Sequence, residues 1–145
     1  MEKASAKEII NGFNDTKYIT PRGAGKIVEA GSNENGHYIK YANGVMECWH
    51  VHYMGSCEFQ LYSGGLYTDQ THGGYYQWTF PQKFKMLQSQ NNSVAVSVTA
   101  YSSAYLCTSA GGINDGCART NIYYHTNYPC TVGVNLSMRA IGWWK

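Results

Sequence analysis

Strict alternation marks residues 93–101, which read Ser93-Val94-Ala95-Val96-Ser97-Val98-Thr99-Ala100-Tyr101. Valine occupies every second position from 94 to 98, and small side chains lie between. Successive side chains of a strand point to opposite faces, so this spacing predicts a β-strand with one apolar face. Residues 130–142 alternate in the same way and predict a second long strand of this kind.

Strand patterns recur along the chain and are separated by turn signals, of which Asn43-Gly44 is the strongest. The other predicted strands cover residues 37–41, 45–54, 58–62, 75–80 and 121–125. Residues 102–119 are mostly small and polar and are expected to form a loop. Strands joined by turns at such short intervals are typical of an antiparallel β-sandwich. We therefore expect an all-β head over residues 34–145.

Residues 1–33 are expected to form a stem, because residues 1–30 are rich in charge and contain no Cys or Trp. A short helix is predicted over 4–13, where Ser5 would be the N-cap and Glu8 would complete a capping box. A second helical piece is predicted over 24–30, followed by a linker at 31–33. Helices this short are not stable alone, so this stem needs neighbouring chains or upstream sequence.

The composition excludes several classes of partner. The formal net charge is +2 and charged residues make up 14% of the chain, too few to indicate nucleic acid as the partner. No apolar run approaches the roughly 18 residues that span a bilayer, and the N-terminus does not read as a signal peptide. Five cysteines cannot all pair within one chain, which favours free thiols and folding in a reducing cytoplasm.

Four segments of the chain resemble the C-terminal receptor-binding tips of bacteriophage tail fibres. The first covers residues 4–26, with Asp15-Thr16-Lys17-Tyr18-Ile19-Thr20-Pro21 as its most specific part, and the second is a hairpin from Asn35 to Trp49 built around Asn43-Gly44. Trp78-Thr79-Phe80-Pro81-Gln82-Lys83-Phe84 is similar to a segment shared by these tips and H-type lectin domains. The end, Gly142-Trp143-Trp144-Lys145, is similar to a common fibre C-terminus in which Arg usually stands where this chain has Trp143.

The resemblance implies a homotrimeric β-sandwich at the distal end of a tail fibre in the virion. Its expected partners are two further copies of the chain, the upstream fibre shaft, and a host surface glycan or outer-membrane protein. It implies neither nucleic-acid binding nor membrane insertion. The loops at 62–76 and 102–129 match nothing in the family, as expected if loops carry the specificity.

Tyrosines gather around these two loops, and the chain contains 13 of them. Tyr presents a large ring and a hydroxyl at low entropic cost, which suits binding surfaces and the stacking of sugars. The candidate ligand-binding residues are Tyr62, Tyr67, His72, Tyr75, Tyr76, Tyr101, Tyr105, Tyr123, Tyr124 and Tyr128. The competing interpretation is that many of these rings pack in the core or between chains.

Two groups of residues have atoms that suit a metal. His50 and His52 lie two apart on one face of a predicted strand, so three copies on a trimer axis would offer six imidazoles to a transition metal. The simpler interpretation is a pair of ordinary strand histidines. Cys107, Cys117, His125 and Cys130 lack the close spacing of a zinc site, so we expect ordinary thiols and no cofactor there.

Two other functions compete with adhesion. A depolymerase would need a pair of carboxylates, and Glu47 and Glu58 on neighbouring predicted strands are the candidates. The chain has only nine acidic residues, so we expect no enzyme. The third possibility is a structural domain that nucleates trimerisation and caps the fibre.

Overall fold

The structure, a computed structural model, describes residues 25–89 and 93–145. These residues form nine strands, all paired antiparallel, and no helix. The strands are β1 (Ile27–Asn33), β2 (Gly36–Tyr41), β3 (Val45–Ser63), β4 (Leu66–Asp69), β5 (Tyr75–Thr79), β6 (Val94–Tyr101), β7 (Cys107–Asn114), β8 (Arg119–Thr126) and β9 (Cys130–Trp143). Within the described ranges, no helix has the length and apolar character to cross a membrane. The all-β prediction is confirmed, and the helix expected over 4–13 lies outside the described residues.

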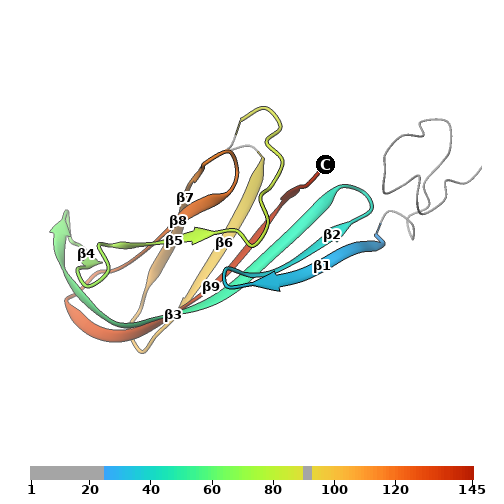
Figure 1. The fold of residues 1–145 in the computed structure, drawn as a ribbon. Helices are drawn as coiled ribbons and strands as arrows, with labels where there is room; N and C mark the ends of the chain where they lie inside the picture. Colours follow the sequence, from blue (N-terminus) through green and yellow to red (C-terminus); the bar gives the residue numbers. More distant parts are fainter. Residues whose placement is uncertain (1–24, 90–92) are drawn as a thin grey trace, which may run out of the picture.

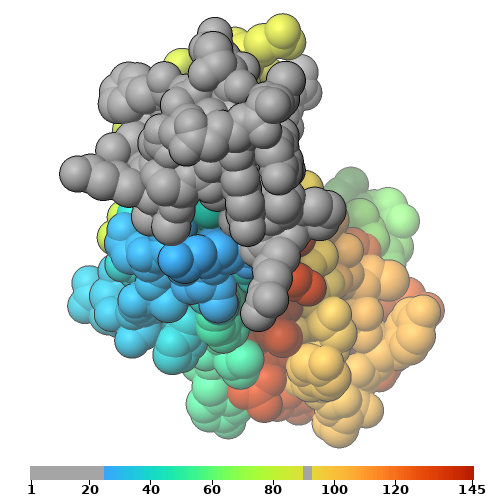
Figure 2. All heavy atoms as spheres, turned by 90° about the vertical axis from the view of Figure 1, so that its right-hand side faces the viewer, coloured from blue at the N-terminus to red at the C-terminus, as the bar shows by residue number. Residues whose placement is uncertain are grey.

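The nine strands form one continuous sheet that folds over into two layers (Figure 1). The first layer, the large sheet, has the order β1-β2-β3-β9-β6. Its strands follow one another from blue through green and red to yellow in Figure 2. The second layer, the small sheet, consists of β5, β8 and β7. Strand β4 joins the layers because it pairs with the end of β3 and with β8.

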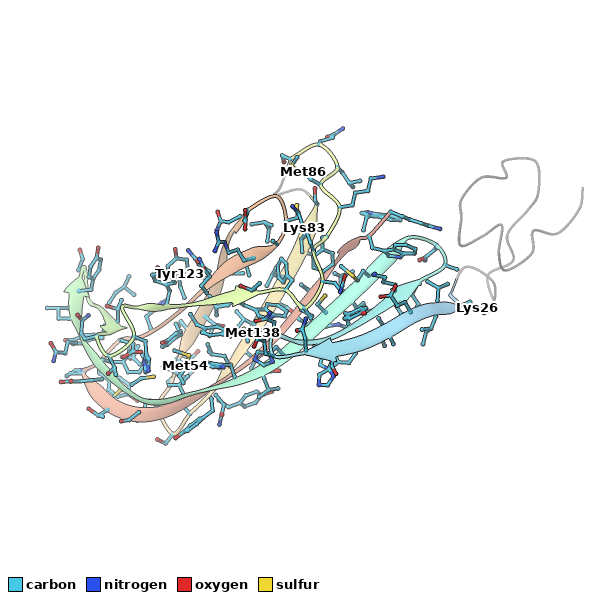
Figure 3. The ribbon with its side chains drawn as sticks, viewed as in Figure 1. Lys26, Met54, Lys83, Met86, Tyr123 and Met138 are labelled. Atoms are coloured by element: carbon cyan, nitrogen blue, oxygen red, sulfur yellow. The ribbon has the colours of Figure 1, made fainter. Side chains whose placement is uncertain are left out.

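The core lies between the two sheets, where Met54 and Met138 project from the large sheet toward the small one (Figure 3). The small sheet contributes Trp78 and Ile122, both fully buried. The Trp78 ring contacts Phe80 edge to face at 5.0 Å, and Phe80 contacts Phe84 in the same way at the same distance. The segment from Trp78 to Phe84 therefore contributes three buried aromatic rings that pack in series in the core.

Strand β3 is one long strand where two were predicted. A bulge between Tyr53 and Gly55 interrupts its register with β9, and Gly55 has a positive φ of 78°. The extra residue changes which positions face the core, from Met54 before the bulge to Cys57 and Phe59 after it. The bulge explains why the alternation breaks in the sequence although the strand continues.

The helix predicted over 24–30 is wrong, because residues 27–33 form β1 and pair along β2. Among residues 25–89 and 93–145 no helix is available for this stretch to pack against, whereas the edge of β2 offers a ladder of hydrogen bonds. The predicted linker 31–33 belongs to the same strand, so the sheet begins at Ile27. The loop predicted over 102–119 is also partly wrong, because it contains β7.

The C-terminus closes over the predicted Asn43-Gly44 hairpin. Gly44 has a φ of 95° and its N–H donates to the Tyr41 carbonyl, as the turn requires. The Trp144 indole N–H donates to the same carbonyl oxygen at 3.0 Å. Trp143 instead lies on the outer face of the large sheet with 40% of its surface exposed. The two adjacent tryptophans therefore have different roles, one in packing and one on the surface.

Candidate ligand-binding face

The outer face of the small sheet carries a pair of tyrosines on neighbouring strands. Tyr75 on β5 is paired with Tyr123 on β8, and their ring centroids are 5.8 Å apart. Both rings are exposed, and Figure 3 shows Tyr123 on the small sheet. The alternation of β8 explains this orientation, because Ile122 and Tyr124 are fully buried on the opposite face.

Gly111 on β7 leaves room for the Tyr123 ring because it has no side chain. A Cβ at Gly111 would lie 2.8 Å from Cε2 of Tyr123, closer than a side chain tolerates. The edge of the Tyr123 ring therefore packs directly against the backbone of β7 at Gly111. Such a fixed aromatic ring loses little conformational entropy when a ligand stacks on it.

Polar side chains extend this pair along the same face. The Gln77 amide donates to Oδ1 of Asn121 at 3.2 Å, and Nη1 of Arg119 donates to Oε1 of Gln77 at 3.3 Å. The guanidinium of Arg119 also lies 3.5 Å from Asp115. Donors and acceptors thus line up beside two amphipathic rings, which is the combination that a sugar with apolar C–H faces and many hydroxyls requires. We call Tyr75, Gln77, Arg119, Asn121 and Tyr123 the Tyr75–Tyr123 face.

The other predicted ligand-binding residues lie in separate places. Tyr62 and Tyr67 belong to the β3–β4 hairpin, and Tyr62 is 76% exposed. Tyr101, Tyr105 and Tyr128 lie at the other connections, and the Tyr105 N–H donates to the Tyr128 hydroxyl at 3.3 Å. The structure therefore divides the predicted surface into three groups and leaves the roles of these tyrosines as predictions.

Tyr124 is a correction to that prediction. Its side chain is fully buried, and its hydroxyl donates to Oδ2 of Asp69 at 2.8 Å inside the protein. Burial, and then the hydrogen bond to Asp69, raise the pKa of this phenol. Tyr124 therefore cannot contact a ligand at the surface. The sequence held the signal, since the apolar Ile122 two positions earlier marks the inward face of β8.

His50 and His52 lie on the face of β3 that also carries the buried Met46 and Cys48. The His52 ring stacks on Tyr76 of β5 at 4.3 Å, and the two His rings are 5.9 Å apart. Burial lowers the pKa of both imidazoles, and nearby histidines lower it further, which favours their neutral forms. Tyr76, a predicted ligand residue, is thus half-covered by His52. A shared metal on a trimer axis stays a prediction.

The two candidate catalytic carboxylates do not form a pair. Glu47 and Glu58 both lie on β3, and a rise of about 3.3 Å per residue places them on the order of 30 Å apart. Glycosidase carboxylates lie within about 10 Å of each other. Glu47 accepts a hydrogen bond from Arg139, and Glu58 accepts one from Gln60. This geometry removes the pair that we named for a depolymerase.

The thiols form no disulfide among the described residues, which include all five cysteines. Cys107 and His125 are neighbours across β7 and β8, whereas Cys117 is buried near the Asn114-Asp115-Gly116 turn.

Three residues of the Tyr75–Tyr123 face, Gln77, Arg119 and Asn121, were not predicted from the sequence. The period of two around Tyr75 and Tyr123 was the signal that would have found them, because it places all five residues on one face.

Comparisons with known proteins bear on the fold. Neither the protein-family models nor the curated proteins give a match to the chain. A solved structure, the P. aeruginosa R1 pyocin fiber comprising C-terminal residues 323–701, is similar with a TM-score of 0.52 and 17% sequence identity. The match covers 86% of this chain and 32% of that one, so the chain spans about a third of the fragment. The chain therefore has a fold that is found in part of a pyocin fibre.

Proposed function

We propose that the chain is the receptor-binding tip of a phage or phage-like tail fibre, and that it binds a host surface glycan without chemistry. The observation that carries the proposal is the Tyr75–Tyr123 face, an exposed aromatic pair beside Gln77 and Asn121 on a rigid sheet. The fold shared with part of a pyocin fibre supports the fibre assignment. The resemblance of the Asn35–Trp49 and Trp78–Phe84 segments to fibre tips points to the same class.

We further propose that the working form is a homotrimer whose chains pack through the outer face of the large sheet. This face carries Trp49, Val51 and Tyr53 along β3, and Val51 and Tyr53 are 64% and 66% exposed. Exposed apolar residues aligned on a central strand favour contact with protein, and the resemblance names further copies of this chain as the partner. Three tips would present three ligand sites, so that weak single contacts add up to firm attachment.

Binding to cells and to their polysaccharides tests the proposal. The purified full-length chain is incubated with intact candidate host cells and with polysaccharide extracted from them, and released sugar is assayed in the same samples. We expect saturable binding with no released sugar. Release of sugar would overturn the non-enzymatic assignment, and a folded trimer that binds no host would favour the structural cap.

Matched tyrosine variants locate the site. Tyr123→Ala is expected to lower the affinity at least tenfold, because it removes an exposed ring at the centre of the face. Tyr62→Ala and Tyr105→Ala make the same change in the two other groups of tyrosines and are expected to bind as the unchanged chain does. A loss confined to Tyr62→Ala or Tyr105→Ala would keep adhesion but move the site to that group.

The structural cap is a second candidate, and the apolar outer face of the large sheet favours it. In that case assembly is the whole function, and the Tyr75–Tyr123 face would be an ordinary polar surface. Cell binding that is identical in the unchanged chain, Tyr62→Ala, Tyr105→Ala and Tyr123→Ala would support this candidate over adhesion.

A further inference from the structure

Three side chains that can ligate a metal meet where β3, β4 and the β4–β5 loop come together. They are Cys57 on β3, Asp69 at the end of β4, and His72 in the loop. One ligand atom from each lies within 4.8 Å of the others. Nδ1 of His72 is 2.6 Å from Oδ2 of Asp69 and 3.8 Å from Sγ of Cys57. This cluster includes no residue of the Tyr75–Tyr123 face, and it does not depend on the proposed function.

The surrounding fold holds two of the three ligands in place. The bulge at Gly55 turns Cys57 inward, where its side chain is fully buried. Asp69 is also fully buried, and its Oδ1 accepts a hydrogen bond from the Thr71 N–H at 2.9 Å. Its Oδ2 accepts one from the Tyr124 hydroxyl at 2.8 Å. A carboxylate anchored from behind in this way is the usual support of a metal ligand.

The cluster is poorly suited to thiol catalysis. A catalytic triad needs the thiol and the carboxylate on different nitrogens of the histidine, whereas here both approach Nδ1. Burial, together with the Asp69 carboxylate, raises the pKa of the Cys57 thiol to about 12. A thiol in this state is not a nucleophile near neutral pH, although a metal ion would remove its proton.

We propose that Cys57, Asp69 and His72 bind one thiophilic divalent cation of the zinc type through Sγ, Oδ2 and Nδ1. Thiolate and carboxylate together supply two negative charges, which neutralise the two positive charges of the cation. The imidazole is the third ligand, and a water from the exposed side of His72 takes the fourth position. A mixed sulfur, nitrogen and oxygen set suits zinc, and three protein ligands with one water are typical of open zinc sites.

The distances require one small adjustment. Around a tetrahedral zinc ion, the nitrogen and sulfur ligands lie about 3.6 Å apart, close to the 3.8 Å between Nδ1 and Sγ here. The nitrogen and oxygen ligands lie about 3.3 Å apart, so His72 must move outward from its 2.6 Å hydrogen bond to Asp69. Gly73 and Gly74 follow His72 with φ values of 75° and 85°, and no atom lies within 4 Å of a Cβ at Gly73. The loop therefore has room for this movement.

Cobalt and zinc binding to the full-length chain tests the proposal. The chain is stripped of metal with a chelator and titrated with Co²⁺, whose thiolate complexes absorb in the near ultraviolet, and Zn²⁺ is then added in competition. We expect one Co²⁺ per chain, displacement by Zn²⁺, release of protons on binding, and a higher melting temperature with Zn²⁺. Absence of binding to a folded chain would overturn the proposal.

Matched variants assign the ligands. Cys57→Ser and His72→Ala are expected to weaken binding at least tenfold, and Tyr124→Phe about tenfold through the loss of its support to Asp69. Cys107→Ser and His125→Ala make the same kinds of change at a neighbouring pair and are expected to bind normally. His72 lies in an exposed loop, so its variant remains informative if Cys57→Ser does not fold. Binding that survives His72→Ala and is lost in His50→Ala would refute this site in favour of the β3 histidines.

Discussion

The two outer faces of the sandwich expose different kinds of side chain. On the small sheet, Gln77, Asn121 and Arg119 are hydrogen-bonded to one another beside two exposed rings. On the large sheet, Val51 and Tyr53 stand exposed in a row that continues from Trp49. A surface whose polar side chains are fixed by hydrogen bonds suits a hydrated ligand, whereas a row of exposed apolar side chains favours contact with protein. This difference is the basis for proposing one face for a ligand and the other for further copies of the chain.

The two sides of β3 carry different kinds of side chain. The inward side carries Met46, Cys48, His50 and His52, and the outward side carries the aromatic and β-branched residues. A free monomer would gain more by burying the outward side. This distribution supports the proposal that the outward side of β3 contacts further copies of the chain.

A charge on the large sheet is expected to have the largest effect. Val51→Asp would place a carboxylate in the proposed chain contact, where burial of an unpaired charge is prohibitive, and we expect the trimer to dissociate into 16.2 kDa chains. Light scattering after size-exclusion chromatography measures the mass. Ser109→Asp puts the same charge on the small sheet and should leave a trimer. A Val51→Asp trimer, or an unchanged chain that is monomeric, would refute the role of this face.

The second largest effect is expected at Asp69, at the end of the strand β4 that joins the two layers. Burial acts to raise the pKa of Asp69, but hydrogen bonds from His72, Tyr124 and the Thr71 N–H outweigh it and leave the pKa below its ordinary value. The ionised carboxylate therefore stabilises the fold at neutral pH. Asp69→Asn is expected to cost about 3 kcal/mol in metal-free buffer at pH 7, since it breaks a buried charged network.

The stabilisation by the Asp69 carboxylate is expected to decrease at low pH. Because the folded pKa lies below the unfolded value of about 4, the folded state binds fewer protons in that window and loses stability as the pH falls through it. Urea unfolding between pH 7 and pH 3 should show the gap between Asp69→Asn and the unchanged chain narrowing below about pH 4. Asp115→Asn makes the same change at an exposed turn and should show no such gap. A gap that is constant with pH would contradict the role of the Asp69 charge.

The sequence predicts the long strands well, but it predicts their pairing and their bulges poorly. The alternation at 93–101 and 130–142 gave β6 and β9 almost residue for residue. The helix predicted over 24–30 and the linker predicted over 31–33 are both wrong because they rest on local residue preferences, whereas pairing with β2 determines that residues 27–33 form a strand. The bulge at Gly55 was invisible because it is a property of two paired strands.

The candidate sites follow the same rule. Tyr75 and Tyr123 were predicted as rings that flank two different loops, and only the register between β5 and β8 shows that they are partners. The Cys57, Asp69 and His72 cluster joins residues from two strands and a loop, at spacings that match no metal motif in the sequence. Features that depend on one strand can be predicted from sequence, and features that depend on how strands meet cannot.

Glycines beneath the tyrosines of the two faces offer a matched pair of small changes. Gly111→Ala would push on the Tyr123 ring, where a Cβ would meet Cε2 at 2.8 Å, and is expected to weaken glycan binding about fivefold, or about 1 kcal/mol. Gly133→Ala makes the same change under Tyr53 on the large sheet, where the nearest atom is 3.5 Å away, and should leave binding unchanged. Isothermal titration with host polysaccharide measures both. Equal losses in the two variants would show that the effect is not specific to the Tyr75–Tyr123 face.

The smallest expected effect concerns the ion pair between Arg139 and Glu47, which crosses β9 and β3 on the large sheet. The Arg139 side chain is 57% exposed in the single chain, so in the Val51→Asp monomer Arg139→Ala should cost only about 0.5 kcal/mol of unfolding free energy. In the trimer the same pair would lose its water, and removal of the guanidinium would leave Glu47 buried without a partner, at a cost several times larger. Denaturation of Arg139→Ala with and without Val51→Asp therefore compares the same pair in solvent and in the proposed contact. Equal costs in the two backgrounds would mean that this face stays in water, and the distinction between an assembly face and a ligand face would fail.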